Sequence, residues 1–209
     1  MTNSSAPPGM LSAPAPVGEP LEDIRHVILD RDGVLNEEAS NGGYIRDSQC
    51  FHWLPGALRG LARLRGLGLR ISIATNQSGI GRGLLSEAAL HAIHQTMVRE
   101  AQEAQASIDA VFYCPHAPNA RCDCRKPAPG LINTAIASAG IPAKQTLIIG
   151  DDLKDLEAAR SAGVRAVLVR TGKGHQFEST AVANNIAVFD NLEAVALSLS
   201  ERDNSPCGA

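Results

Sequence analysis

Residues 27–36 read VILDRDGVLN, an apolar run rich in β-forming residues that ends abruptly in two carboxylates. In an extended segment residues i and i+2 project to the same side, so Asp30 and Asp32 can address one point just beyond a buried strand. Two carboxylates about 4 Å apart repel by about 4 kcal/mol at an effective dielectric near 20, so this pair needs a cation or a shared proton. Gly33 suits a sharp turn after the strand. The stretch indicates a metal and phosphate site, although calcium loops, capped turns and plain surface acids share its short pattern.

The composition is that of a globular protein. It has 209 residues, 44% hydrophobic content and a net charge of -3, which fits one substantial domain and does not favour binding to nucleic acid. No apolar span is long enough for a membrane helix and no signal-peptide pattern is present, so we expect a cytoplasmic monomer without membrane contact. Five prolines in residues 1–20 predict a disordered leader, followed by a domain over 21–200 and a flexible tail over 201–209.

Strand and helix patterns alternate along the predicted domain. Ser86 is a candidate N-cap, Gly140 a candidate helix stop, and Asp190 with Glu193 resembles a capping box at the start of the last helix. This alternation predicts an α/β fold, a doubly wound parallel sheet with helices on both faces. The strands are expected at 27–29, 69–74, 110–113, 146–149, 166–169 and 186–189, and the helices after 55, 86, 129, 153 and 192.

Polar clusters directly follow three of the predicted strands. Asp30 and Asp32 follow the first, Thr75 the second, and Asp151 the strand at 146–149. In open α/β sheets ligands bind outside the carboxyl ends of the strands, so these groups should meet at one edge. With Lys126 entering from a loop, the edge would hold a nucleophilic carboxylate, a hydroxyl, a cation and further acids, which suits magnesium-assisted phosphoryl transfer.

The order of these motifs resembles that of a known superfamily. Asp30-x-Asp32-Gly-Val, Thr75-Asn76, Lys126 and Gly150-Asp151-x-x-x-Asp155 are similar to the four motifs of the haloacid dehalogenase-like (HAD) phosphatases. Within it the chain resembles the D-glycero-D-manno-heptose 1,7-bisphosphate 7-phosphatases, and next the histidinol-phosphate phosphatases. The segments that carry the closer resemblance are TNQSGIGRG at 75–83, CPH at 114–116, CDCRKP at 122–127 and VRTGK at 169–173.

The resemblance implies a role for each catalytic residue. Asp30 would be the nucleophile that forms an aspartyl-phosphate, and Asp32 the acid and then the base. Thr75 and Lys126 would hold the phosphoryl oxygens. Magnesium would bind to Asp30, to the backbone carbonyl of Asp32 and to Asp151.

It also implies a substrate site for a small sugar bisphosphate. Arg125 would recognise the substrate, and Arg82 or Lys173 could bind its second phosphate. We expect Asp155 to be a supporting acid near a helix end and Asp152 to be an ordinary surface acid. The remaining expected substrate-binding residues are Gly43, Tyr44, Asn76, Gln77 and Ser78.

A cysteine-rich loop supplies four soft ligand groups, Cys114, His116, Cys122 and Cys124. These ligand types suit tetrahedral structural zinc, although the one-residue gaps are tighter than the common zinc-finger spacings. A zinc ion there would fix the direction of the following Arg125 and Lys126. Cys50 and Cys207 are expected to be plain thiols, and His91 and His94 ordinary surface or boundary residues.

Two alternatives stay open at this point. The chain could be a histidinol-phosphate phosphatase, because the loop between His116 and Cys122 is short, or another small sugar-phosphate phosphatase. It could also be a HAD-fold domain that binds phosphate or a protein without turnover. The intact set of catalytic residues disfavours the second alternative.

Overall fold

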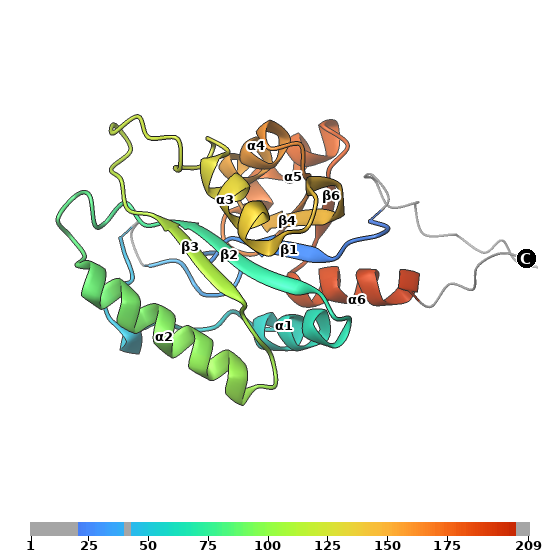
Figure 1. Ribbon diagram of the computed structural model, residues 1–209, viewed down its shortest axis with the longest axis horizontal. Helices are drawn as coiled ribbons and strands as arrows, with labels where there is room; N and C mark the ends of the chain where they lie inside the picture. The colour runs from blue at the N-terminus through green and yellow to red at the C-terminus, as the bar shows by residue number, and fades with distance from the viewer. Residues whose placement is uncertain (1–20, 40–42, 204–209) are drawn as a thin grey trace, which may run out of the picture.

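The structure is a computed structural model that describes residues 21–39 and 43–203, so the predicted leader and residues 204–209 of the predicted tail lie outside it. Its centre is a sheet of six parallel strands in the order β3-β2-β1-β4-β5-β6 (Figure 1). This order confirms the predicted doubly wound sheet, and it places β1 in the interior, between β2 and β4. The strands are β1 His26–Leu29, β2 Arg70–Asn76, β3 Ala110–Cys114, β4 Thr146–Gly150, β5 Arg165–Val169 and β6 Ala187–Phe189.

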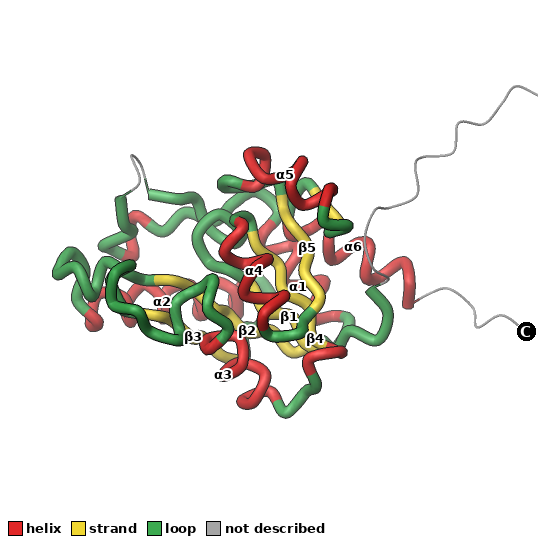
Figure 2. The backbone as a smooth tube through the Cα atoms, turned by 90° about the horizontal axis from the view of Figure 1, so that it is seen from above, coloured by secondary structure: helices red, strands yellow, loops and turns green. Residues whose placement is uncertain are grey.

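Helices cover both faces of the sheet. On one face lie α1 Ala57–Gly66, α2 Glu87–Glu103 and α6 Leu192–Asp203, and on the other α3 Gly130–Ala139, α4 Leu153–Ser161 and α5 Gly174–Ala183 (Figures 1 and 2). Two short 3₁₀ turns, Ser48–Cys50 and Ala143–Gln145, lie in the connections. No helix in the described ranges is long and apolar enough to cross a membrane.

The alternation of strand side chains divides the core into two layers. Val27 and Leu29 of β1 pack in the larger cluster with α1, α2 and α6, whereas Ile28 packs in a second cluster with α3 and α4. All three are at most 1% exposed, as expected for an interior parallel strand that is covered on both faces. The strand that leads to Asp30 is therefore enclosed on both faces of the sheet.

Most of the predicted helix signals are confirmed. The Ser86 side chain accepts a hydrogen bond from the Ala89 amide at 3.1 Å, and Gly140 ends α3 in the left-handed conformation at φ +67°. The predicted capping box before α6 is wrong. Asn191 caps that helix by accepting from the Ala194 amide at 3.0 Å, because Asp190 and Glu193 are used elsewhere in ion pairs with arginines.

Two features of the second half were not predicted. Helix α5 follows β5, although its sequence GHQFESTAVA has only two buried residues and hence little periodicity to read. At the start of α4, Asp152 and Asp155 form a reciprocal capping box. The Asp155 carboxylate accepts a hydrogen bond from the Asp152 backbone amide, and the Asp152 carboxylate accepts one from the Lys154 backbone amide. Asp152, expected to be an ordinary surface acid, thus fixes the direction in which α4 leaves the site.

Candidate active site

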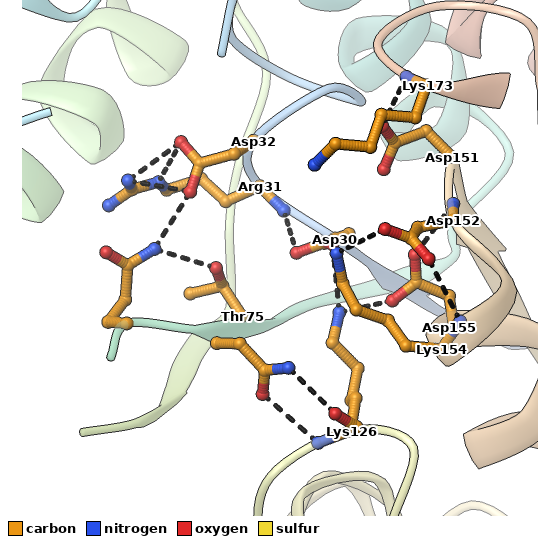
Figure 3. A network of polar contacts seen from close by, with 12 residues as sticks. Asp30, Arg31, Asp32, Thr75, Lys126, Asp151, Asp152, Lys154, Asp155 and Lys173 are labelled. Carbon is orange, nitrogen blue, oxygen red and sulfur yellow. Dashed lines mark hydrogen bonds and ion pairs between the residues drawn. The ribbon is translucent and has the colours of Figure 1, made fainter. Parts of the chain in front are cut away.

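The predicted catalytic residues meet at the carboxyl ends of β1, β2 and β4. Figure 3 shows Asp30, Thr75, Lys126 and Asp151 around one centre, although they lie far apart in the sequence. They surround or line a small cavity of about 180 Å³ beside Asp30 and Asp32. The cavity is lined by Asp30, Arg31, Asp32, Glu38, Ala39, Gly43, Tyr44, Ile45, Thr75, Asn76, Gln77, Arg125, Lys154 and Lys173.

Asp30 is held in one orientation by two donors. Its Oδ1 accepts from the Arg31 amide at 2.7 Å, and its Oδ2 pairs with Lys126 Nζ at 3.1 Å. Lys126 Nζ also lies 2.5 Å from Asp155 Oδ1, and all three residues are at most 5% exposed. Burial would lower the pKa of Lys126, but the carboxylates of Asp155 and Asp30 outweigh it and raise that pKa. Lys126 is therefore an ammonium that faces Asp30.

Asn76 fixes the backbone of Lys126. Its side-chain amide donates to the Lys126 carbonyl at 3.0 Å and accepts from the Lys126 amide at 3.1 Å. Asn76 was predicted to bind substrate, and it does line the cavity. Its hydrogen bonds, however, position Lys126.

Asp151 has one oxygen without a partner. Its Oδ2 accepts from the Lys173 amide at 2.9 Å, while its Oδ1 is buried and meets no hydrogen-bond donor among the described residues. Burial, with the nearby charges of Asp30 and Asp155, raises the pKa of Asp151 to about 8. An anionic oxygen in such a place is stabilised by a cation.

Two glycines make room for that carboxylate. Gly33 has φ +88° and Gly172 φ +57°, and a Cβ atom on either would overlap Asp151 Oδ2. Asp30, Asp151 and Asp155 can bring one oxygen each within 4.8 Å of one another. Hard carboxylate oxygens are the ligands that magnesium prefers, so the residues fit the predicted ion. Lys126 pairs with both Asp30 and Asp155, whereas Asp151 Oδ1 has no partner among the described residues, so Asp151 is the best placed of the three to bind the ion.

Asp32 has different neighbours from Asp30. Arg31 Nη2 donates to both of its oxygens, at 2.8 and 2.9 Å, and Asn36 and Gln77 each add a donor at 2.9 Å. Burial would raise the pKa of Asp32, but the charge of Arg31 and these hydrogen bonds lower it below the usual value. In this arrangement Asp32 is a carboxylate that is turned toward Arg31 (Figure 3).

A buried arginine and histidine support this arrangement. Arg31 is 1% exposed, and its Nη1 lies 3.1 Å from Nε2 of His94. The expectation that His94 is an ordinary surface or boundary residue is wrong, since it is 7% exposed and contacts the site through Arg31. His91, by contrast, is exposed and lies beside Tyr113. The only sequence signal for His94 was its place on the buried face of the helix.

The predicted substrate-binding residues line the cavity or border it. Gln77 Nε2 donates to Thr75 Oγ1 at 2.9 Å, and the Tyr44 hydroxyl lies 3.1 Å from Ser78 Oγ. Arg82 donates to the same hydroxyl at 2.9 Å, so Arg82 and Tyr44 lie together at the rim. Gly43 and Arg125 also line the cavity, and Arg125 Nη1 is a buried donor without a partner among the described residues. That free donor suits an anionic or hydroxylated ligand.

Two further lysines belong to the rim. Lys173 Nζ pairs with Glu38 at 2.6 Å, and Lys154 Nζ pairs with Asp152 at 3.0 Å. Lys154 was not predicted, because a lysine in the first turn of a helix has no sequence pattern of its own.

The four predicted zinc ligands form a compact cluster. The three sulfur atoms of Cys114, Cys122 and Cys124 lie 3.2–3.6 Å apart, and His116 Nδ1 lies 3.2 Å from Cys124 Sγ. Four ligands about 2.3 Å from a central ion at tetrahedral angles lie about 3.8 Å from one another, close to this spacing. The donor set therefore fits a structural zinc ion. Cys50 is a free thiol away from the cluster, and Cys207 lies outside the described residues.

Comparisons with known proteins agree with this geometry. Residues 123–195 match the profile of the HAD-hydrolase-like family. A Pseudomonas putida D-glycero-β-D-manno-heptose-1,7-bisphosphate 7-phosphatase is 38% identical over 84% of this chain and 99% of its own length. The enzyme of that name from Bordetella bronchiseptica is 38% identical over 83% and 96% of the two chains.

Solved structures are similar as well. The D,D-heptose 1,7-bisphosphate phosphatase of B. bronchiseptica, complexed with magnesium and phosphate, has a TM-score of 0.80 at 36% identity and covers 86% of this chain and 99% of its own. The corresponding protein of Burkholderia thailandensis has a TM-score of 0.65 at 35% identity and covers 84% and 98%.

The parallel sheet and the acid-lined site at its edge define a HAD-like hydrolase. The profile match alone covers only the second half of the domain. The similarity to the curated enzymes extends over nearly their whole length, and on that ground the chain belongs to the family of the D-glycero-β-D-manno-heptose-1,7-bisphosphate 7-phosphatases.

Proposed function

We propose that this chain is a magnesium-dependent phosphatase that removes the 7-phosphate of D-glycero-D-manno-heptose 1,7-bisphosphate. One observation carries the proposal. The buried carboxylate of Asp30 is held by Lys126 and lies beside Asp151, which has an unpaired buried oxygen. This is a nucleophile with a cation-binding group next to it, at the edge of the sheet where ligands bind.

In the first half-reaction an oxygen of Asp30 attacks the phosphorus atom of the 7-phosphate. The P–O bond to the sugar breaks, and the leaving oxygen takes a proton from Asp32. This step requires Asp32 to be protonated and to turn from Arg31 toward the substrate. Lys126 and the Thr75 hydroxyl hold the phosphoryl oxygens meanwhile, so that the group transfers in line.

In the second half-reaction water attacks the aspartyl-phosphate. Asp32, now a carboxylate, takes the proton of the water, the P–O bond to Asp30 breaks, and inorganic phosphate leaves. The bonds from Arg31, Asn36 and Gln77 hold Asp32 in its charged form, which suits this role of base. Arg31, between Asp32 and His94, is thus a positioning residue for the acid/base group.

Magnesium, held by Asp30, Asp151 and the backbone carbonyl of Asp32, supplies positive charge that offsets the repulsion between these carboxylates and a phosphate dianion. The ammonium and amide donors of this chain also stabilise that negative charge, and they are held in place before the substrate binds. Asn76 serves this purpose by fixing Lys126.

Specificity rests on the rim of the cavity. Arg125 has a free buried donor and Arg82 lies against Tyr44, so a second phosphate away from the scissile bond can make charge-assisted hydrogen bonds there. Histidinol phosphate lacks that second phosphate. The names of the relatives also favour the heptose bisphosphate over that alternative.

Zinc completes the proposal. Bound to Cys114, His116, Cys122 and Cys124, it would fix the loop that leads directly into Arg125 and Lys126. We also propose a cytoplasmic location, and a monomer as the working form because each residue that the mechanism uses belongs to this one chain.

A substrate panel tests the function. Purified protein with magnesium is given both anomers of the heptose 1,7-bisphosphate, histidinol phosphate and an aryl phosphate, and kcat/KM is measured for each. We expect the bisphosphate to exceed histidinol phosphate by at least about tenfold, or about 1.4 kcal/mol. Equal or reversed values would refute the heptose assignment, and absence of phosphate release from every substrate would refute the phosphatase itself.

A further inference from the structure

Lys154 lies in the first turn of α4, at the mouth of the active-site cavity. It lines the same cavity as Asp30 and Thr75, and Figure 3 places its ammonium group beside Asp30. Its side chain is 28% exposed, so the ammonium is open to the cavity and within reach of a ligand there. The mechanism proposed above gives this lysine no role.

Asp152 orients Lys154 toward the cavity. One oxygen of Asp152 accepts from the Lys154 backbone amide at 3.2 Å, and the other accepts from Lys154 Nζ at 3.0 Å. The same carboxylate therefore begins the helix and turns the side chain of Lys154 back over the helix N-terminus. A surface ion pair is worth little as a source of stability, so its effect on direction is the more informative property.

The three lysine ammonium groups near Asp30 differ in how fully carboxylates already neutralise them. Lys126 is already paired with two carboxylates, Asp30 and Asp155. The Lys173 ammonium is held by Glu38 at 2.6 Å. Among the described residues, the Lys154 ammonium has one hydrogen-bonding partner, Asp152, which is itself 19% exposed. A phosphoryl group at Asp30 adds negative charge on the side of the cavity that Lys154 faces.

We propose that Lys154, positioned by Asp152, is a further catalytic residue that donates to an oxygen of the transferring phosphoryl group. Lys126 holds that group from the buried side, and Lys154 holds it from the open side. The contact is with the phosphoryl group and not with the sugar. It therefore stabilises the transition states of both half-reactions, and it does so for every phosphate monoester that the enzyme accepts. The inference rests on the proposed phosphatase function.

Three variants separate this role from a structural one. Lys154→Met removes the charge with similar length, Lys154→Arg keeps the charge, and Lys144→Met removes an exposed lysine beyond the opposite end of β4. We expect Lys154→Met to lower kcat/KM at least about tenfold, by the same factor for the heptose bisphosphate and for an aryl phosphate. Lys154→Arg should recover most of the loss, and Lys144→Met should match the unmodified protein. A loss confined to the heptose bisphosphate would overturn the proposal, because it would place Lys154 on the sugar.

Binding of inorganic phosphate gives a readout without turnover. With magnesium present, calorimetry should show a Kd for phosphate that is about tenfold weaker in Lys154→Met and nearly restored in Lys154→Arg. A Kd and a kcat/KM that both stay within twofold in a folded Lys154→Met protein would refute the proposal. If the heptose bisphosphate proves a poor substrate while phosphate binding still depends on Lys154, only the proposed natural substrate fails.

A second measurement needs no variant and so does not depend on folding. The protein without substitutions is treated with a reagent that acetylates lysines, once with magnesium and phosphate together and once with neither. Acetylation of each lysine is then quantified by peptide mass spectrometry. We expect phosphate with magnesium to protect Lys154 at least fivefold while Lys144 reacts equally in both samples. Equal acetylation of Lys154 in both samples would contradict the contact.

Discussion

Asp30 and Asp32 are two residues apart in the sequence, yet different neighbours give them different chemistry. Asp30 meets Lys126 and lies next to the unpaired oxygen of Asp151, which suits the proposed role of Asp30 as the nucleophile. Asp32 meets Arg31, Asn36 and Gln77, on the side of the cavity away from the cation-binding group. In the proposed mechanism, this one motif thus separates attack on phosphorus from proton transfer.

Replacement of each carboxylate should show this division. Asp30→Asn should abolish multiple turnover, because an amide cannot form the phosphoryl adduct. Asp32→Asn should slow turnover by about 10²–10⁴-fold and accumulate the aspartyl-phosphate from an activated aryl phosphate, since the base of the second step is lost. Intact-mass analysis would detect the adduct. Near-normal turnover in Asp30→Asn would contradict its role as nucleophile.

The glycines around Asp151 allow a test with a matched control. Gly172 and Gly163 both have a positive φ, +57° and +66°, but only at Gly172 would a Cβ overlap the carboxylate of Asp151. Both alanine variants should lose roughly 1 kcal/mol of stability from backbone strain. Only Gly172→Ala should also weaken magnesium activation, by about tenfold in the concentration for half-maximal rate. Equal magnesium dependence in the two variants would argue against Asp151 as a ligand.

The loop after β3 is an element with few buried apolar side chains, so a zinc ion would have to replace a core. We expect about one zinc per chain by elemental analysis of protein that is prepared without chelators. Cys122→Ser should lose the zinc, lower Tm and reduce kcat together, because Arg125 and Lys126 follow directly in the chain. Cys50→Ser is the control, since Cys50 is exposed and outside the cluster. Protein without zinc but with full activity would contradict the structural role.

The sheet itself contains a buried titratable group, His26, that the sequence patterns did not predict. His26 in β1 is fully buried, 2.9 Å from Ser72 Oγ of β2 and 3.3 Å from Thr146 Oγ1 of β4. Burial and the charge of Arg70 lower the pKa of His26 to about 4, against a smaller opposing effect of Asp109. The folded protein therefore keeps this imidazole neutral.

This predicts a stability that falls as the solution is acidified. Between pH 6.5 and about 4 the unfolded chain binds a proton at His26 that the folded chain does not, so unfolding is favoured as pH falls. Each tenfold difference in proton affinity is worth about 1.4 kcal/mol, which makes the loss on the order of 3 kcal/mol. Urea unfolding at several pH values gives the free energy of unfolding as a function of pH. Its slope should be shallower in His26→Gln than in the control variant His52→Gln, because His52 is exposed. Equal slopes would contradict the assignment.

The elements differ in how well sequence predicted them. Strands such as 146–150 are continuous apolar runs that end in polar clusters, and this pattern identified both the sheet and the place of Asp151. Helix α5 was missed because its two buried residues give little periodicity. The cap at Asn191 was missed because the neighbouring Asp190 offered an equally good local signal, and the ion pairs of Asp190 and Glu193 with arginines decide between them. Arg31 and His94 were missed because their contact joins segments that are far apart in the sequence. Lys154 was missed because a lysine in the first turn of a helix has no sequence pattern of its own.

At the scale of the whole molecule, helices from the first and the last part of the domain are packed together. Helix α6 lies against α1, where a Cβ on Gly60 would come within 2.8 Å of Leu192 Cγ. Arg59 of α1 also pairs with Glu193 at 2.8 Å. The C-terminal helix thus completes the core beneath the strands that carry the catalytic residues.

Truncations should therefore define the domain that the sequence predicts over 21–200. A chain that stops after Asn191 loses the buried Leu192, Val195 and Leu199, each worth about 1.5–3 kcal/mol. That sum approaches the whole net stability of a typical domain, about 5–15 kcal/mol, so we expect this chain to lack a cooperative unfolding transition. A chain of residues 21–203 keeps every described element and should retain Tm and kcat/KM. Calorimetry and the aryl phosphate assay would compare the two with the full chain. Cooperative unfolding of the chain without α6 would show that its packing is dispensable, and a loss of activity in 21–203 would place a functional segment outside the predicted domain.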